Sequence, residues 1–583
     1  MSDIKAVVYS ALMMHRFIAI VIVFLISVVR TSSASSLLSA VYLRSEYLVD
    51  PIIVATLTPR FSWVLPTTVV DRGVVQSAFL LTVMSGNASG AVVWSSGKVL
   101  TSQQNQIAYS GPQLAPDTTY FWTVQWWDGA GIAAPNSAPA SFGTAPGDDS
   151  AWFAASSQWI GCTGVGANSN QLRVDFSSQP PTVGVTLTRA TLYISGLGWH
   201  IPFINGARLS RSVFEPAFTH LRLRVLYSAH DVSHLLDTSI GSNNTLAVFL
   251  GNGWPGQFEP WEGNVFGEPL WNGTVNTMDS ESFLGSAGDS ESLTQKELKM
   301  KRREGVGHGK SGYERRLRTW LSLQWSDGSA SRIVSSAGSL GYINGDMSPQ
   351  PVWQCGSGAL LSDDIYAGVQ YDARKETIGW TTPGFNFSTG VWGEAVRISE
   401  PGGAMSPAVS QPVQVTNELP PCALWESTPG VWVFDFCQNF AGVIRLTLPS
   451  PTQPGTVITI RHAEAVMHPP YGPKDGTLYY GNLRSAEATD TYITRGDDNG
   501  ETWEPFFTWH GFRYISITGL THTPTLTGGT VLGLHFHSDM PVVGALAFAP
   551  AANTLNQLQH AVVWTQASNI LGNPSDCPQR DER

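Results

Sequence analysis

Apolar and polar residues alternate along most of this chain. The pattern is clear in "VVWSSGKVL" (92–100), in "TTYFWTVQWWD" (118–128) and in "VWVFDFCQNFAGVIRLTL" (431–448). Alternation with a period of two predicts strands with one face buried, and the Gly, Asn and Pro residues between the runs predict turns. The sequence therefore predicts a mostly β protein, built of several β-sandwich or jelly-roll domains in tandem.

Two short turn signals predict hairpins within this pattern. "RATLYISGLGWHIPFINGARL" contains Asn205-Gly206, and "TWLSLQWSDGSASRIVSS" contains Asp327-Gly328. Asn-Gly and Asp-Gly pairs adopt the left-handed backbone that joins two antiparallel strands. Each pair is expected to be a hairpin turn.

The period changes near the C-terminus. Four residues have helical spacing: Leu555, Leu558, Val562 and Thr565. Asn553 is the predicted N-cap of this helix, which is the first convincing one along the chain. Pro574 and Pro578 end it, so "NPSDCPQRDER" (573–583) is expected on a loop. Loops carry a large share of catalytic groups.

The length of 583 residues fits about four domains. The predicted division is a signal peptide at 1–34, a fibronectin type III-like sandwich at 41–146, a second β domain at 151–397, a third β-sandwich at 405–545 and a helical segment at 546–583. Residues 276–318 are rich in Ser, Gly, Glu, Lys and Arg, and are expected to be an inserted loop. Its basic run, "KELKMKRREGVGHGK", is either a patch for nucleic acid or lipid or, as we favour, a solvated part of the insertion.

The N-terminus has the features of a secretory signal. Lys5 and Arg16 precede an apolar run at 17–29, and Ser32 and Ala34 fit a small-x-small cleavage site. The alternative is an uncleaved membrane anchor, for which the run is short. We therefore expect a secreted protein, or one delivered to a vacuole-like compartment by the secretory route, without a membrane attachment after cleavage.

Composition limits which binding partners the protein can have and which cellular compartment it can occupy. The formal net charge is −11 and only 14% of residues are charged, which argues against nucleic acid as a partner. The five cysteines are too widely spaced for a metal motif and leave at least one thiol after one or two bridges. Sequons permit secretion without proving it; they begin at Asn87, Asn243, Asn272 and Asn386.

The final loop contains the densest group of chemically active side chains. Asp576, Arg580, Asp581 and Glu582 lie close together in the sequence. A carboxylic acid that splits a glycosidic bond must keep its proton near neutral pH, and burial and a neighbouring carboxylate both raise its pKa. An arginine can bind sugar hydroxyls or hold a carboxylate. From these residues alone, a solvated terminal turn remains the simpler alternative.

Resemblance to a family changes this assessment. "NPSDCPQRDER" resembles the signature of the α-L-rhamnosidases, inverting glycoside hydrolases with several β domains and an (α/α)6 catalytic barrel. Further blocks resemble the family in the same order across nearly the whole chain. They are "LRSEYLVDPIIVATLTPRFSW" in a fibronectin-like domain, "LYISGLGWHIPFINGARL", "FLGNGW" and "YAGVQYDAR" in a lectin-like N-terminal domain, and "DFCQNFAG", "RHAEAV" and "EPFFTWHGFRYISITGL" in a concanavalin-like sandwich.

The resemblance implies roles for the loop. Glu582 would be the general acid, with Asp581 as a rival for that role, and Asp576 and Arg580 would bind rhamnose hydroxyls. His510 and Arg513 in "TWHGFRY" are expected to be structural. One departure is Cys437 in "DFCQNFAG", where relatives usually carry Gly.

The resemblance also implies what is missing. The family's general base is a Glu on the barrel with no counterpart here, and Glu464 in "RHAEAV" does not resemble it. Only the first helix of the barrel is expected, so we expect a truncated product or partial gene model, inactive alone. The substrate class would be rhamnose-containing glycosides or polysaccharides, with no cofactor and no metal.

The alternative is a secreted, non-catalytic carbohydrate-binding protein that stacks sugars on exposed aromatic rings. Trp254, Trp261 and Trp271 are candidates for a sugar groove, although packing in the core is the commoner fate of such residues. An in-frame barrel beyond codon 583 would support the enzyme, and a stop codon would support the binding protein.

Overall fold

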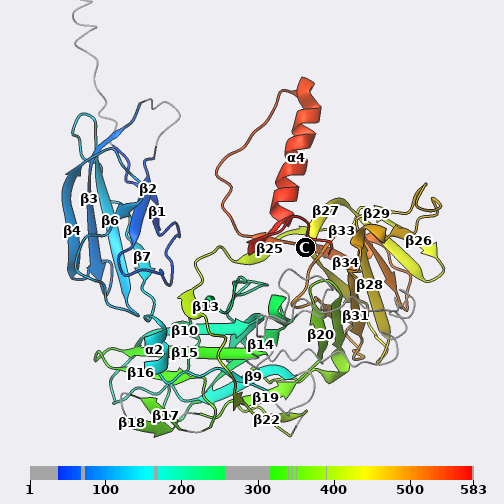
Figure 1. The fold of residues 1–583 in the computed structure, drawn as a ribbon, viewed down its shortest axis with the longest axis horizontal. Coiled ribbons are helices and arrows are strands. Elements are labelled where there is room, and N and C mark those ends of the chain that lie inside the picture. Colours follow the sequence, from blue (N-terminus) through cyan, green and yellow to red (C-terminus); the bar gives the residue numbers. More distant parts are fainter. Residues whose placement is uncertain are drawn as a thin grey trace, which may run out of the picture. The chain divides into compact units, whose positions relative to one another are not determined.

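The protein is described here from a computed structural model, in which two compact units are distinguished, Met1–Thr144 and Ala145–Arg583. The structure describes residues 37–66, 73–162, 169–256, 315–338, 340–343, 346–349, 351–388 and 390–580. The predicted signal peptide at 1–34, nearly all of the predicted insertion at 276–318, and Asp581 and Glu582 lie outside the described residues. The strands that make up each unit are drawn as arrows in Figure 1.

The first unit is a β-sandwich made of two sheets. One sheet has the order β1-β2-β5, and the other has the order β4-β3-β6-β7. The strands are β1 (Val41–Ser45), β2 (Arg60–Val64), β3 (Gln76–Ser85), β4 (Val92–Leu100), β5 (Ile107–Ala108), β6 (Thr119–Asp128) and β7 (Ala140–Gly143). In β6, Tyr120, Trp122, Val124 and Trp126 are buried while the residues between them are half-buried. The alternation in the sequence thus predicted the buried face of this strand correctly.

The second unit begins with two more sheets that enclose a core of aliphatic side chains. The first has the order β23-β8-β15-β10-β13-β24, with β16 beside β15. Its strands are β8 (Ile160–Gly161), β10 (Leu187–Leu197), β13 (Arg224–Asp231), β15 (Arg316–Trp325), β16 (Ala330–Val334), β23 (Val396–Arg397) and β24 (Ala404–Pro407). The second has the order β12-β11-β14-β9-β19-β22. Its strands are β9 (Ser169–Phe176), β11 (Trp199–Ile204), β12 (Ala207–Arg208), β14 (Asn244–Gly251), β19 (Gln354–Ser357) and β22 (Trp392–Glu394).

Both predicted hairpin turns are present. Ile204 pairs with Ala207 around Asn205-Gly206, and both turn residues have positive φ. Trp320 to Gln324 pair with Val334 to Ala330 around the turn that contains Asp327-Gly328. A disulfide between Cys162, directly after β8, and Cys355 in β19 joins the two sheets of this sandwich.

A sheet of ten strands forms the remainder of the β structure, in the order β20-β21-β31-β28-β33-β27-β34-β25, with β26 and β32 paired to β27. The strands are β20 (Leu360–Asp364), β21 (Gly368–Asp372), β25 (Val413–Leu419), β26 (Ala423–Thr428), β27 (Val431–Leu448), β28 (Val457–Ala463), β31 (Thr489–Ile493), β32 (Glu501–Trp503), β33 (His510–Thr518) and β34 (Val531–Ser538). Two-stranded pairs complete the set: β17 (Leu340–Ile343) with β18 (Asp346–Pro349), β29 (Ala465–Val466) with β30 (Leu478–Tyr479), and β35 (Ile570–Leu571) with β36 (Asn573–Pro574).

The ten-stranded sheet draws strands from two of the predicted segments. β20 and β21 belong to the 151–397 segment, yet β21 pairs in parallel with β31, for example Gln370 with Thr491. The sequence division between 397 and 405 therefore does not coincide with an edge of this sheet. The mostly β fold class, followed by a single long helix, is confirmed.

Within the described part of the chain, the α-helices are α2 (Asp149–Ala154) and α4 (Asn553–Ser568). The predicted helix spacing is confirmed by α4, but the prediction that Asn553 is its N-cap is wrong. A 3-10 turn at Pro550–Ala552 leads directly into the helix, so the backbone of Asn553 is already helical and Ala552 holds the cap position. None of the helices within the described ranges is both long enough and apolar enough to cross a bilayer.

Candidate active site

The signature loop begins directly after α4. The chain forms the small hairpin of β35 and β36 around Gly572, whose φ is +84°, and the amide of Ser575 donates to the carbonyl of Asn569 over 2.8 Å. Asp576 is exposed and Arg580 is half-buried on the loop that follows. The structure thus places these two predicted site residues on one loop, whereas Asp581 and Glu582 lie beyond the described residues.

Three strands of the ten-stranded sheet contact this loop or the end of α4. The Ala441 amide in β27 donates to Ser568 Oγ over 3.2 Å. The Gly572 amide donates to Ser538 Oγ, at the end of β34, over 3.1 Å. Pro578 and Gln579 lie so close to Gly511 in β33 that a methyl group there would be 2.8 Å from Gln579 Cβ. Sequence reasoning missed these supporting residues, although the glycine of "TWHGFRY" was a signal that could have led to one of them.

Most of α4 is poorly covered by the rest of the chain. Four apolar side chains are about half exposed: Leu555, Leu558, Val562 and Val563. Near the helix end, by contrast, Trp564 stacks on His535 with ring centroids 4.8 Å apart. Closer to the middle of the helix, His560 Nε2 lies 3.3 Å from Gln438 Oε1 in β27. The contacts of α4 with the sheet that are seen among the described residues thus lie from the middle of the helix onward.

His510 is structural, as predicted. Its Nε2 lies 3.1 Å from both oxygens of Asp490, and both side chains are buried. Burial raises the pKa of Asp490, but the charge and hydrogen bond of His510 outweigh it and hold that pKa below its usual range. The His462 ring stacks on His510 at 4.0 Å. Burial and the neighbouring His510 lower the pKa of His462 to about 3, so this ring is neutral.

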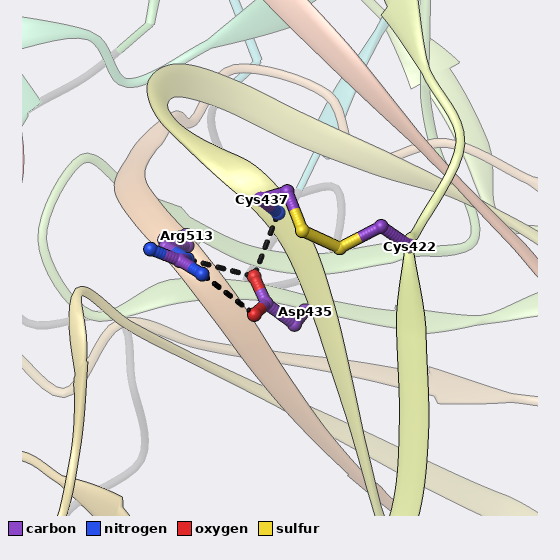
Figure 2. The surroundings of a disulfide bond; sticks show 4 residues. All are labelled: Cys422, Asp435, Cys437 and Arg513. Atoms are coloured by element: carbon purple, nitrogen blue, oxygen red, sulfur yellow. Dashed lines mark hydrogen bonds and ion pairs between the residues drawn. A yellow bond between two sulfur atoms is a disulfide. The ribbon is translucent and has the colours of Figure 1, made fainter.

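Arg513 is structural too, and it lies beside a disulfide (Figure 2). Its Nε and Nη2 each contact one oxygen of Asp435 at 2.8 Å, and the Cys437 amide donates to the same carboxylate over 2.6 Å. Cys437 is bonded to Cys422. The φ of Cys437 is +59°, a backbone region that favours glycine.

Three groups of side chains among the described residues have the composition of metal ligands. The thiols of Cys422 and Cys437 are consumed by their disulfide. In the second group, His200 Nδ1 accepts from the Gly196 amide over 3.0 Å, so in the neutral ring the proton is on Nε2 and no lone pair remains there for a metal. In the third, Nε2 of both His462 and His510 faces the Asp490 carboxylate, at 3.9 and 3.1 Å, and His462 Nδ1 lies 3.0 Å from the Ala488 carbonyl.

Glu464 is hydrogen-bonded to neighbouring side chains, and Trp254 is packed against another aromatic ring. Glu464, directly between β28 and β29, accepts hydrogen bonds from the amides of Asn439 and Asn482, each over 2.8 Å. Trp254 packs against Trp509, with ring centroids 5.9 Å apart, as the packing alternative predicted. Trp261 and Trp271 lie outside the described residues.

Four family models match the chain in series. Residues 40–148 match the Rha78A-like N-terminal immunoglobulin domain, and 185–269 with 310–417 match the α-L-rhamnosidase N-terminal domain. Residues 426–537 match the bacterial α-L-rhamnosidase concanavalin-like domain, and 545–583 match the bacterial α-L-rhamnosidase 6 hairpin glycosidase domain. The last match covers α4 and the signature loop.

Individual relatives agree with the family models. An α-L-rhamnosidase of Streptomyces avermitilis is 32% identical over 75% of this chain and 35% of its own length, and one of Formosa agariphila is 28% identical over 96% of this chain and 53% of its own. The chain thus spans between about a third and a half of these curated relatives.

Solved structures have the same fold. The α-L-rhamnosidase from Dictyoglumus thermophilum superposes with a TM-score of 0.74 and 29% identity, over 94% of this chain and 54% of that one. The Streptomyces avermitilis enzyme complexed with L-rhamnose superposes with a TM-score of 0.71 and 24% identity, over 93% of this chain and 61% of that one. With four domain models in one order and this structural likeness, the chain belongs to the bacterial α-L-rhamnosidase family.

Proposed function

We propose that this protein, with a complete six-hairpin domain, hydrolyses terminal α-L-rhamnosides of glycosides or polysaccharides with inversion at the anomeric carbon. One observation carries the proposal: the 545–583 segment matches the family's glycosidase domain and contains "NPSDCPQRDER". The position of that loop at the end of α4, outside the packed core of the sheet, supports access to a sugar.

Each residue of the loop has a proposed role. Glu582 protonates the leaving oxygen, with Asp581 as the rival for this role, and Asp576 and Arg580 bind rhamnose hydroxyls. Asp576 is an exposed residue of this loop. Inversion also needs a carboxylate base about 6.5–9.5 Å from the acid, which activates water on the opposite face of the sugar. We propose that this base is a carboxylate of the six-hairpin domain.

Two substitutions test the acid in a chain that includes the complete six-hairpin domain. Glu582→Gln should lower kcat on an alkyl rhamnoside by about 10²–10⁴-fold, because the leaving alkoxide then departs without a proton. Asp581→Asn is the matched control and should have a much smaller effect. If the two effects are reversed, Asp581 is the acid, and if both variants keep full turnover, neither residue is; a wild-type chain that does not hydrolyse rhamnosides would show that the proposed function is wrong.

We infer that the protein follows the secretory route. The sequence pattern at 1–34 and the two disulfides, Cys162–Cys355 and Cys422–Cys437, support this, because disulfides persist in oxidising compartments. Expression in a secreting host followed by N-terminal sequencing of the medium fraction tests it. A mature N-terminus near Ser35 is expected, and retention of Met1 in the cytosol would contradict the inference.

A further inference from the structure

We propose that Gly511 is a positioning residue that fixes the distance between the signature loop, which carries the proposed acid, and the ten-stranded sheet. The proposal rests on the proposed function, since it assigns a purpose to the contact between Gly511 and residues 578–579. Gly511 does not touch the reacting atoms. It acts through the loop that carries Arg580 and, three residues beyond Gln579, Glu582.

Three adjacent strands hold the loop and the end of the helix that precedes it. β33, β27 and β34 are neighbours in the sheet. Gly511 in β33 contacts residues 578–579 of the loop, Ser538 in β34 accepts from the Gly572 amide, and the Ala441 amide in β27 donates to Ser568, the last residue of α4. Ala441 and Gly511 are direct partners across the β27–β33 ladder, so the contacts to the loop and to the helix end lie side by side in the sheet.

The approach at Gly511 leaves no room for a side chain. An added Cβ would lie 2.8 Å from Gln579 Cβ, 2.9 Å from the Gln579 backbone nitrogen and 2.9 Å from Pro578 Cγ. These atoms belong to the backbone, a proline ring and the first side-chain carbon. None is the far end of a flexible side chain, so the contact cannot be relieved by a rotamer change.

The strand beneath the loop is held firmly on both sides of Gly511. His510 is bonded to the buried Asp490 at 3.1 Å. Phe512 is fully buried and packs on Phe440, with ring centroids 4.5 Å apart. Because β33 is anchored through both neighbours, a methyl group at Gly511 should displace the loop and not the strand.

A small displacement of the loop is enough to affect proton transfer. Misplacement of a catalytic group by about 1 Å can lower a rate by about 100-fold. An acid that is out of place affects substrates with poor leaving groups most, since nitrophenolate departs with little protonation whereas an alkoxide does not. The ratio of kcat on an alkyl rhamnoside to kcat on nitrophenyl rhamnoside therefore measures the effect on the acid. This ratio does not depend on the amount of folded enzyme.

The first test is kinetic, in a chain with the complete six-hairpin domain. For Gly511→Ala, kcat on an alkyl rhamnoside should fall by about 10–100-fold, and kcat on nitrophenyl rhamnoside by less than about threefold, with KM little changed. Gly533→Ala in β34 is the matched control. Its new Cβ would meet the core ring of Phe440 at 2.6 Å and not the loop, so it should lower Tm without changing the ratio. Equal loss on both substrates for Gly511→Ala would overturn the proposal.

The second test needs no activity. Hydrogen exchange of the 583-residue chain should show faster exchange at the Gly572 and Ser575 amides in Gly511→Ala than in wild type, and unchanged exchange in Gly533→Ala. Unaltered exchange of the loop in Gly511→Ala would overturn the positioning role even if the enzyme is a rhamnosidase. Absence of rhamnoside hydrolysis in the wild-type chain with the complete six-hairpin domain would instead refute the proposed function and leave this contact to be judged by exchange alone.

Discussion

The ten-stranded sheet buries its apolar side chains, whereas the helix that follows it leaves several of its own exposed. In the sheet, apolar residues such as Phe440 and Ile515 are buried, and the buried acid Asp490 has a histidine partner. In α4, Leu555, Leu558 and Val563 are about half exposed, and the contacts with the sheet among the described residues come from the middle of the helix onward. The signature loop therefore obtains its position from the sheet, because the helix itself has few contacts that could fix it.

The largest stability effect should come from breaking the buried pair in the sheet. His510→Ala leaves Asp490 as a buried carboxylate that keeps the Val369 amide but loses its histidine, and it should lower the free energy of unfolding by about 3–5 kcal/mol. The double variant His510→Ala with Asp490→Asn removes the uncompensated charge. It should be more stable than His510→Ala alone, as measured by urea unfolding, and a less stable double variant would contradict this account.

The disulfide at the bulge of β27 should have the next largest effect. Cys422 and Cys437 are 15 residues apart, and closing a loop of that size contributes about 3 kcal/mol. Replacing Cys422 by Ala and Cys437 by Gly should lose somewhat less than this, since glycine relieves the positive φ of Cys437. The matched pair with Cys437→Ala should be about 1 kcal/mol less stable than the glycine pair in urea unfolding. Equal stabilities would show that the backbone at 437 relaxes once the bridge is absent.

The pH dependence of stability should reveal the neutral His462 in the core. Its folded pKa of about 3 is below the ordinary value of 6.5, so the unfolded chain binds a proton that the folded chain does not. Stability should therefore fall as pH decreases from about 6.5 toward 3, by about 1.4 kcal/mol per pH unit from this group. His462→Phe should reduce the slope of unfolding free energy between pH 6 and 5 by about that amount. An unchanged slope would mean that His462 is protonated in the folded protein.

The smallest effect should be found on the exposed side of α4. Leu558→Lys in the 583-residue chain should change the free energy of unfolding by no more than about 0.5 kcal/mol, because the side chain is 58% exposed. Trp564→Ala, near the anchored end, should cost about 1–2 kcal/mol through the lost stacking on His535. Both changes in the free energy of unfolding are measured by thermal unfolding. Similar losses for the two variants would contradict the division of the helix into an exposed part and a part anchored to the sheet.

The sequence by itself determined the local structure. Alternation predicted the buried face of β6, Asn205-Gly206 and Asp327-Gly328 predicted their hairpins, and helical spacing predicted α4. The capping residue of α4 was not predicted, since the 3-10 turn at Pro550 extends the helical backbone by one position. These features depend on neighbours within a few residues, which is why a pattern along the chain can reveal them.

Only the tertiary structure decided which distant segments meet. It paired β21 with β31, joined Cys162 to Cys355 and Cys422 to Cys437, and gave His510 its partner Asp490. It also placed Gly511 beneath Gln579, a contact between residues that no periodicity relates. Such contacts arise when strands pack in three dimensions, and the free energy that selects them depends on shape and burial that a one-dimensional pattern does not contain.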